Sequence, residues 1–409
     1  MSRALRLNEQ VQQLGTEAAL EVLARVRHLE AQGRSILHLE IGEPDFLTPP
    51  HIVEAGIRAL RDGASKYAPA AGLPELRAVI AQWSRGRGLS VAPENVLVTS
   101  GAKPMLFYAL TALVNPGDEV LIPDPGFPIF ESAVRYAFGR PVTYHVNPAS
   151  QQPVDPSEIA RRISSKTRVL VLNSPHNPTG AVLDSVTLAA LAKLAERRRL
   201  TIISDEIYSR LVFDGEHRSI ASFPGMSERT VVIDGFSKAY AMTGWRLGYG
   251  IMPTSVASHI ERYIINTTSC APPFVQHAGI AALTGPQTCV DDMRDEYRAR
   301  LGFMVLGLNK VQGVSCAVPK GAFFVFPTIS GLLQRTKASA DEFADSLLDK
   351  FNLACLPGSA FGSGGADHLR FSLAASWSTL ERALEVLNDA VEVRPGSSRA
   401  SDSYRMRAL

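Results

Sequence analysis

Residues 200–208 read LTIISDEIY, and residues 230–249 read TVVIDGFSKAYAMTGWRLGY. Each stretch begins with a continuous apolar run of strand length and then changes to polar residues, as a buried strand does at its end. Three further apolar runs precede them, with helical patterns in between: NVLVT at 95–99, EVLIP at 119–123 and RVLVLN at 168–173. This alternation predicts an α/β fold with a mostly parallel sheet and helices on both faces.

The length of the chain predicts two domains, because 409 residues exceed what one hydrophobic core usually serves. We expect a large domain over residues 48–290. A smaller α+β domain is expected from residues 1–47 and 291–393, where a long charged helix is followed by hairpin signals. Residues 394–409 lose apolar periodicity and gain Ser and Arg, which predicts a flexible tail.

The composition is typical of an ordinary globular enzyme, with 45% hydrophobic and 20% charged residues. Lys and Arg number 42 against 40 Asp and Glu, so we expect no nucleic-acid partner. The four cysteines have no CxxC spacing, which favours a reducing compartment and predicts no metal site. The N-terminus lacks a signal-peptide pattern and no apolar run reaches membrane-spanning length, so we expect a cytoplasmic protein without a membrane partner.

A lysine follows the last apolar run. At a strand end, Lys238 becomes a nucleophilic amine if burial and nearby positive charge lower its pKa, and Arg246 can supply that charge. Lys238 is therefore a candidate for forming a Schiff base. Taken alone, the SK pair is better explained by surface cations in a loop, and the segments that accompany it favour the Schiff base.

An acidic residue ends the run at 200–205. Asp205 at the end of a buried strand is costly unless it meets a cation, and a protonated pyridine nitrogen is such a cation. Acidic residues also commonly begin the loop after a strand, and for Asp205 taken alone that explanation is preferred.

Two earlier strand ends carry small or amide residues. In NVLVTSGAKPML, at 95–106, Gly101 and its neighbours lead into a helix expected from Pro104 to Val114, whose free N–H groups can bind phosphate. In SPHNPTG, at 174–180, the Asn177 amide can donate to a phenolate or a carboxylate. Plain turns explain both segments as well.

Together and in this order, these segments resemble the class I/II aminotransferase family of fold-type-I enzymes dependent on pyridoxal 5′-phosphate (PLP). The resemblance extends from GEPDF at 42–46 and KYAPAAGLPELR at 66–77 to HLRFSLA at 368–374. It implies a large PLP-binding domain with a mostly parallel central sheet and a smaller α+β domain. It also implies a homodimer with active sites at the subunit interface.

The resemblance implies cofactor contacts. Lys238 would hold PLP as a Schiff base, Asp205 would pair with the pyridine nitrogen, and both would be catalytic together with Tyr208. Asn177 and Tyr208 would contact the phenolic oxygen, and Phe127 would stack on the ring. The phosphate would be held by Ser100, Gly101, Ala102, Ser237 and Arg246, with Lys103 close by.

Further residues would serve the substrate or the second subunit. Arg370 would grip the substrate α-carboxylate through a bidentate pair, with Gly42 and Asn177 adding contacts. Tyr67 would reach the phosphate in the neighbouring subunit. A surface charge at a strand edge is the alternative for Arg370, and an ordinary core residue is the alternative for Phe127.

The implied activity is a ping-pong transfer of an amino group between an L-amino acid and a 2-oxo acid, with Lys238 moving the Cα proton. We expect a neutral donor such as alanine, with 2-oxoglutarate or pyruvate. GAFFVFP at 321–327 suggests hydrophobic walls, and Thr111 lies where dicarboxylate-specific members can place a lysine.

Two alternatives remain open. The same residues serve enzymes of this fold that eliminate or replace a β or γ group, cyclise an amino acid, or oxidise it. A PLP-binding transcription regulator would need a DNA-binding domain, and only about forty residues precede GEPDF.

Overall fold

A seven-stranded sheet forms the centre of the computed structural model, which describes residues 5–392. Its strands are β2 (Val96–Thr99), β3 (Glu119–Asp124), β4 (Arg140–His145), β5 (Thr167–Asn173), β6 (Thr201–Asp205), β7 (Thr230–Gly235) and β8 (Gly248–Ile251). Their spatial order is β2-β8-β7-β6-β5-β3-β4. Strand β8 is antiparallel to both of its neighbours and the remaining pairs are parallel. The predicted α/β fold with a mostly parallel sheet is confirmed, and the expected tail at 394–409 lies outside the described residues.

The two strands that the sequence analysis did not predict have weak strand signals. Strand β4 lies at the edge of the sheet and contains Pro141. Strand β8 contains Gly248 and Gly250, which are poor strand formers. A Cβ atom at Gly248 would lie 2.3 Å from the backbone nitrogen of Ala102, so the close approach of β8 to the next helix requires glycine there.

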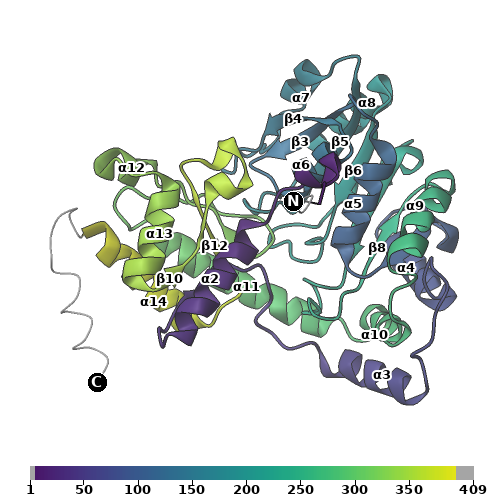
Figure 1. Ribbon diagram of the computed structural model, residues 1–409, viewed down its shortest axis with the longest axis horizontal. Coiled ribbons are helices and arrows are strands. Elements are labelled where there is room, and N and C mark those ends of the chain that lie inside the picture. Colours follow the sequence, from purple (N-terminus) through teal and green to yellow (C-terminus); the bar gives the residue numbers. More distant parts are fainter. Residues whose placement is uncertain (1–4, 393–409) are drawn as a thin grey trace.

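Helices cover both faces of this sheet (Figure 1). One face is covered by α5 (Ala102–Leu113), α6 (Ile129–Tyr136) and α9 (Thr254–Thr267). The other face is covered by α4 (Pro74–Gly86), α7 (Pro156–Arg162), α8 (Ser185–Arg198) and α10 (Pro273–Thr284), and α3 (Pro50–Arg61) packs against α10. In β5, Val169 and Val171 face the first layer, whereas Leu170 and Leu172 face the second. Burial on both faces explains the continuous apolar runs.

A smaller unit joins the beginning and the end of the chain, on the left of Figure 1. Its helices are α2 (Ala18–Ala31), α11 (Thr288–Leu308), α12 (Ser330–Thr336), α13 (Ala340–Phe351) and α14 (Trp377–Glu392), while the short α1 (Glu9–Gln12) contacts α6. Its strands are β1 (Leu37–His38), β9 (Phe324–Val325), β10 (Leu353–Ala354), β11 (Leu356–Pro357) and β12 (Leu369–Ser372). The expected domain boundaries stay predictions.

Strand pairing and ion pairs hold the early segment in this unit. Strand β1 pairs with β10 in parallel, and β12 lies between β11 and β9. Arg25 of α2 forms ion pairs with Asp345 and Asp349 of α13 at 2.6 and 2.8 Å. In β1, Leu37 and His38 pair with Leu353 and Ala354 of β10.

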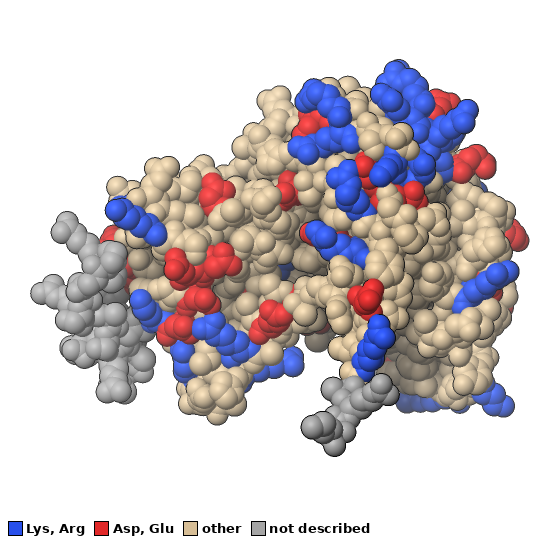
Figure 2. All heavy atoms as spheres, turned by 45° about the horizontal axis from the view of Figure 1, so that its top comes forward, with Lys and Arg blue, Asp and Glu red and all other residues tan. Residues whose placement is uncertain are grey.

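Charge is unevenly distributed on the face drawn in Figure 2. Lys and Arg gather over the top of the large sheet, the region of α7 and α8, and Asp and Glu group on the smaller unit. None of the helices within residues 5–392 is both long and apolar enough to cross a bilayer.

Candidate active site

Lys238 lies just beyond the end of β7, at the edge where the parallel strands end. Its amino group donates a hydrogen bond to the backbone oxygen of Gly42 at 2.5 Å. The same nitrogen lies 5.9 Å from the centre of the Phe323 ring, just before β9. Lys238 therefore lies between the large sheet and the smaller unit, at the edge where open α/β sheets bind ligands.

The surroundings of Lys238 weaken its hold on a proton. Burial lowers the pKa of Lys238 to about 8. The positive charges of Arg370, Lys103 and Arg246 act in the same direction, and the Glu43 carboxylate opposes them. A lysine with this pKa is a stronger nucleophile near neutral pH than an ordinary surface lysine.

Asp205 ends β6 and is 3% exposed. Burial raises its pKa to about 7, and the carboxylates of Asp234 and Glu206 contribute, whereas Lys238 lowers it. The backbone N–H of Ile207 donates to Asp205 Oδ1 at 3.2 Å. A buried carboxylate in this state is stabilised by a cation placed against it.

Arg370 lies in β12, the middle strand of the three-stranded sheet, and is 3% exposed. The alternative that it is a surface charge is therefore wrong. Its Nη1 donates to Asn177 Oδ1 at 3.1 Å and its Nη2 to the backbone oxygen of Glu40 at 2.5 Å. The guanidinium lies over the rings of Phe324 and Phe361, at 4.3 and 4.9 Å.

Tyr208 and Arg370 influence each other across the site. Tyr208 is 4% exposed, and its ring meets those of Phe323 and Phe324 edge-on at 5.4 and 5.8 Å. Burial raises the pKa of Tyr208 above its usual range, and the positive charge of Arg370 opposes that rise. Burial also lowers the pKa of Arg370 to about 10. The Tyr208 hydroxyl and the Arg370 guanidinium are therefore both poorly hydrated, and a bound ligand can supply the hydrogen bonds that water would otherwise form.

Gly101 and Arg246 form a cradle at the start of α5. Gly101 has φ +96°, and a Cβ atom there would lie 2.2 Å from Arg246 Nη2. Arg246 itself is exposed and donates from Nη1 to the backbone oxygen of Thr243 at 2.8 Å. Glycine at 101 thus lets a cation lie against the first turn of α5, which is a favourable place for an anion. The helix begins at Ala102, two residues before the expected Pro104.

Ser100 and Ser237 are the two serines expected to hold the phosphate. Ser100 directly precedes Gly101 and is partly exposed, whereas Ser237 precedes Lys238 and is 7% exposed. Gly248 lies next to the cradle, because its Cα packs against Ala102. The sequence analysis missed this residue. Glycine in a strand marks a close approach of another backbone, but this signal was not available because β8 was not predicted as a strand.

Lys103 forms an ion pair with Glu17 at the N-terminus of α2. The Lys103 amino group also lies 5.5 Å from the centre of the Phe127 ring. Glu17 was not predicted as a site residue, and the contact spans 86 positions of sequence. The pair brings a negative charge to the site, and Glu17 raises the pKa of Arg370.

Tyr67 lies on the segment between α3 and α4 and is 89% exposed. Its phenol therefore faces solvent in the single chain. This exposure is compatible with the expected contact to a neighbouring subunit, which stays a prediction.

A second polar cluster, which the sequence analysis also missed, lies behind Asp205. Glu206 accepts hydrogen bonds from Ser219 at 2.6 Å and from Ser204 at 2.9 Å, and lies 2.9 Å from His217 Nε2. Arg87 forms an ion pair with Asp234 at 3.2 Å. Two of these carboxylates raise the pKa of Asp205, so the cluster affects the site through charge.

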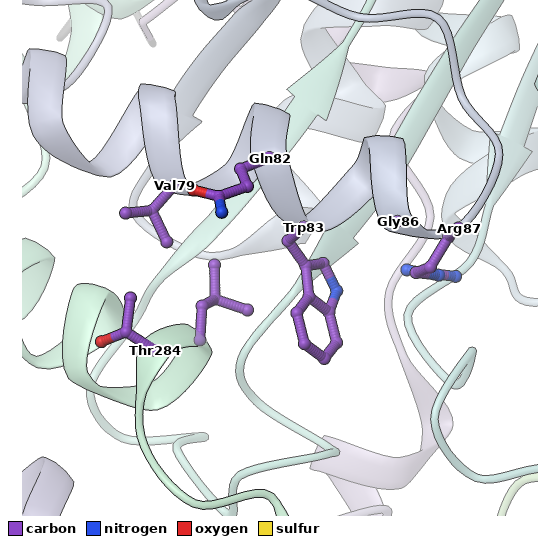
Figure 3. Close-up of a pocket in the computed structure, with 7 residues that line it drawn as sticks. Val79, Gln82, Trp83, Gly86, Arg87 and Thr284 are labelled. Carbon is purple, nitrogen blue, oxygen red and sulfur yellow. The ribbon is translucent and has the colours of Figure 1, made fainter.

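Arg87 also borders a surface cavity of about 550 Å³ between α4 and α10 (Figure 3). The cavity is lined by Val79, Gln82, Trp83, Gly86, Arg87, Leu283 and Thr284. None of the site residues expected from the sequence lines it, so it is separate from the site at Lys238.

Sequence comparison places this arrangement among known proteins. The profile of the family described as aminotransferase class I and II matches residues 34–387. An aspartate aminotransferase of Geobacillus stearothermophilus is 35% identical over 394 residues, which cover 95% of this chain and 100% of the relative. An arginine–pyruvate transaminase of Pseudomonas aeruginosa is 40% identical over 352 residues, covering 86% of this chain and 88% of that protein.

Structure comparison agrees with the sequence matches. The aspartate aminotransferase of Thermus thermophilus, solved with maleate, superposes with a TM-score of 0.89 and 37% identity. The match covers 94% of this chain and 100% of that one.

Proposed function

The chain belongs to the class I and II aminotransferase family and is a PLP-dependent transferase of amino groups; from this premise we propose that its donor is a neutral L-amino acid such as alanine and its acceptor a 2-oxo acid such as 2-oxoglutarate or pyruvate. The transaminase names of the relatives favour amino transfer over elimination, replacement, cyclisation or oxidation.

The residues at the site fit PLP on two observations. The buried Asp205, whose pKa is raised mainly by burial, suits a protonated pyridine nitrogen. The cradle of Gly101 and Arg246 at the start of α5 suits a phosphate. We assign Lys238 to the covalent link, Tyr208 and Asn177 to the phenolic oxygen, and Phe127 to the ring. The phosphate is assigned to Ser100, Gly101, Ala102, Ser237 and Arg246, with Lys103 nearby.

Bound PLP withdraws electrons from the substrate Cα, which makes the Cα proton removable. Arg370 binds and orients the substrate carboxylate, and its contact with Asn177 fixes the plane of the guanidinium. The amino group of Lys238, which would be free once the substrate amine has replaced it on the cofactor, would accept the proton from Cα and pass it to the cofactor; its lowered pKa suits this role. The buried rings of Tyr208, Phe323 and Phe324 exclude water from the site during the proton transfer.

The ion pair between Lys103 and Glu17 is the observation that supports a neutral donor. A dicarboxylate donor needs a second cation for its distal carboxylate, and Lys103 is already paired with Glu17. The hydroxyl of Thr111 donates to the backbone oxygen of Phe107 at 2.7 Å, within its own helix. Phe323 and Phe324 provide apolar contacts instead, and these suit a small or apolar side chain.

The assembly that we propose is a cytoplasmic homodimer in which Tyr67 of each subunit serves the other site. The exposed phenol of Tyr67 supports this arrangement. The four cysteines are free, which is compatible with a reducing compartment.

Steady-state kinetics with single amino donors test the substrate assignment. We expect kcat/KM for alanine to exceed that for aspartate and for arginine when one acceptor is held constant. A preference for aspartate or arginine would overturn the assignment of a neutral donor while leaving the transferase activity intact.

A further inference from the structure

We propose that Glu40 and His38 are positioning residues for Arg370, with the Glu40 carboxylate as a buried counter-ion of the arginine and His38 as the group that balances this carboxylate. The inference rests on the proposed role of Arg370 in binding the substrate carboxylate. It assigns a function to Glu40 and His38, which belong to the segment from β1 to Gly42. Both residues would act on the substrate through Arg370.

Arg370 is linked to the protein surface through Glu40, which it contacts at the backbone and which His38 contacts at the carboxylate. Arg370 Nη2 donates to the backbone oxygen of Glu40. The Glu40 carboxylate lies 2.9 Å from His38 Nδ1, and the opposite nitrogen of the ring lies 3.0 Å from Glu30 at the end of α2. Glu40 is 0% exposed, whereas the side chains of His38 and Glu30 are 36% and 40% exposed. Solvent protons therefore reach this link at His38.

Two buried polar atoms lack a hydrogen-bond partner among the described residues at this point. They are Oε2 of Glu40, an acceptor, and Nε of Arg370, a donor. A buried carboxylate oxygen without a donor depends on nearby positive charge for its stability. The charge of Glu40 also raises the pKa of Arg370, as expected for a favourable electrostatic interaction between the two side chains.

Other titratable groups face this link without replacing it. The buried thiol of Cys355, on the connection between β10 and β11, has its pKa raised by burial and by Glu40, and so stays neutral. Tyr208 and Glu17 act on Arg370 from the large sheet and from α2. The hydrogen bond to Glu40 raises the pKa of His38 to about 9, burial opposes this, and Glu30 adds to it.

The charges give opposite expectations for the two residues. When His38 is protonated, it balances Glu40, and Arg370 keeps its full attraction for a substrate carboxylate. When His38 is neutral, Glu40 is balanced by Arg370 alone, so the arginine attracts the substrate less. Because His38 loses its proton as the pH rises through about 9, carboxylate affinity should be constant below that pH and fall above it.

The test uses the holoenzyme and propionate, a carboxylate without an amino group, as a competitive inhibitor. We expect His38→Gln to raise the inhibition constant roughly three- to tenfold at pH 7.5 and Glu40→Gln to lower it by a similar factor, with both effects on KM and not on kcat. In the wild type the constant should rise between pH 8 and 10, and His38→Gln should remove that rise. Titration of Lys238 is common to both proteins, so their difference reports His38.

His28→Gln is the matched control, because His28 is an exposed histidine of α2, the helix that also carries Glu30, and it contacts Gln32. A change of the same sign in both positioning variants, or a wild-type pH profile that His38→Gln leaves intact, would overturn the positioning role. The wild-type profile serves as the test if Glu40→Gln does not fold. Arg370→Gln separates the role of Arg370 from the positioning role of Glu40 and His38. Unchanged propionate binding in this variant would overturn both roles. Weakened propionate binding in this variant, together with no effect in the His38 and Glu40 variants, would overturn the positioning role alone.

Discussion

The Nη1 atom of Arg370 lies 3.1 Å from the side-chain oxygen of Asn177. Arg370 belongs to the three-stranded sheet of the smaller unit, and Asn177 belongs to the loop after β5 of the large sheet. The hydrogen bond therefore joins the two parts of the chain at the point where we place the substrate carboxylate. A ligand that binds Arg370 contacts both parts at once.

Removing the guanidinium tests this placement. Arg370→Ala should weaken amino-acid binding by roughly 2–5 kcal/mol, the scale for truncating one partner of a buried charge pair. PLP should stay bound, because the residues assigned to the cofactor are unchanged. Arg370→Lys keeps the charge but loses the planar fork, so its KM should lie between those of the wild type and Arg370→Ala. Loss of PLP from the alanine variant would show that Arg370 has a structural role instead.

Lys238→Ala should remove the covalent link to PLP and reduce turnover by roughly 10²–10⁴-fold, the usual contribution of a positioned acid–base group. Borohydride reduction followed by intact-mass measurement checks the link. Lys193→Ala, an exposed lysine on α8, is the control and should keep both the link and the activity. Fixation of PLP to the Lys238 variant would contradict the assignment.

Asp205 should make the protein without PLP less stable as the pH rises. Its pKa is raised from 3.8 to about 7 in the folded chain, so folding favours the protonated form. The resulting penalty is absent below about pH 4, grows up to about pH 7 and is constant above it. Without PLP, Asp205→Asn should therefore unfold at a higher temperature than the wild type at pH 8, with the difference vanishing near pH 4.

Bound PLP should reverse that order, because the ring nitrogen then offers Asp205 a cation. Thermal unfolding with and without PLP measures both effects. An Asp205→Asn variant that PLP stabilises as strongly as it stabilises the wild type would contradict the pairing of Asp205 with the ring.

Glu17→Gln should shift donor preference towards dicarboxylates. The substitution releases Lys103 from its ion pair, so a cation becomes free for a distal carboxylate. We expect the ratio of kcat/KM for aspartate to that for alanine to rise about tenfold, the effect of about 1.4 kcal/mol. Glu9→Gln, an exposed glutamate of α1, is the control. An unchanged ratio would mean that Lys103 does not face the substrate side chain.

Much of the fold follows from local sequence patterns. The five predicted strands of the sheet are buried on both faces, and their apolar runs record that burial directly. Strand β8 could not be predicted in this way, because its glycines serve the contact with α5 and give no apolar pattern. The residues at the strand ends were found because a polar residue after a buried strand is conspicuous.

The residues that the sequence analysis missed are fixed by long-range contacts. Glu17 pairs with Lys103 across 86 positions, and Glu40 meets Arg370 across 330. In the sequence, both glutamates look like ordinary charged residues near helix or strand ends. Only the packing of the early segment against the rest of the chain gives them a place at the site.

The most direct test of amino transfer is a single-turnover titration of the purified holoenzyme with alanine, followed by the absorbance of its lysine-linked cofactor. We predict that this absorbance disappears with release of one 2-oxo acid per site, and that a different 2-oxo acid then restores it. Release of ammonia or consumption of oxygen, without restoration of the absorbance by the second 2-oxo acid, would contradict the account.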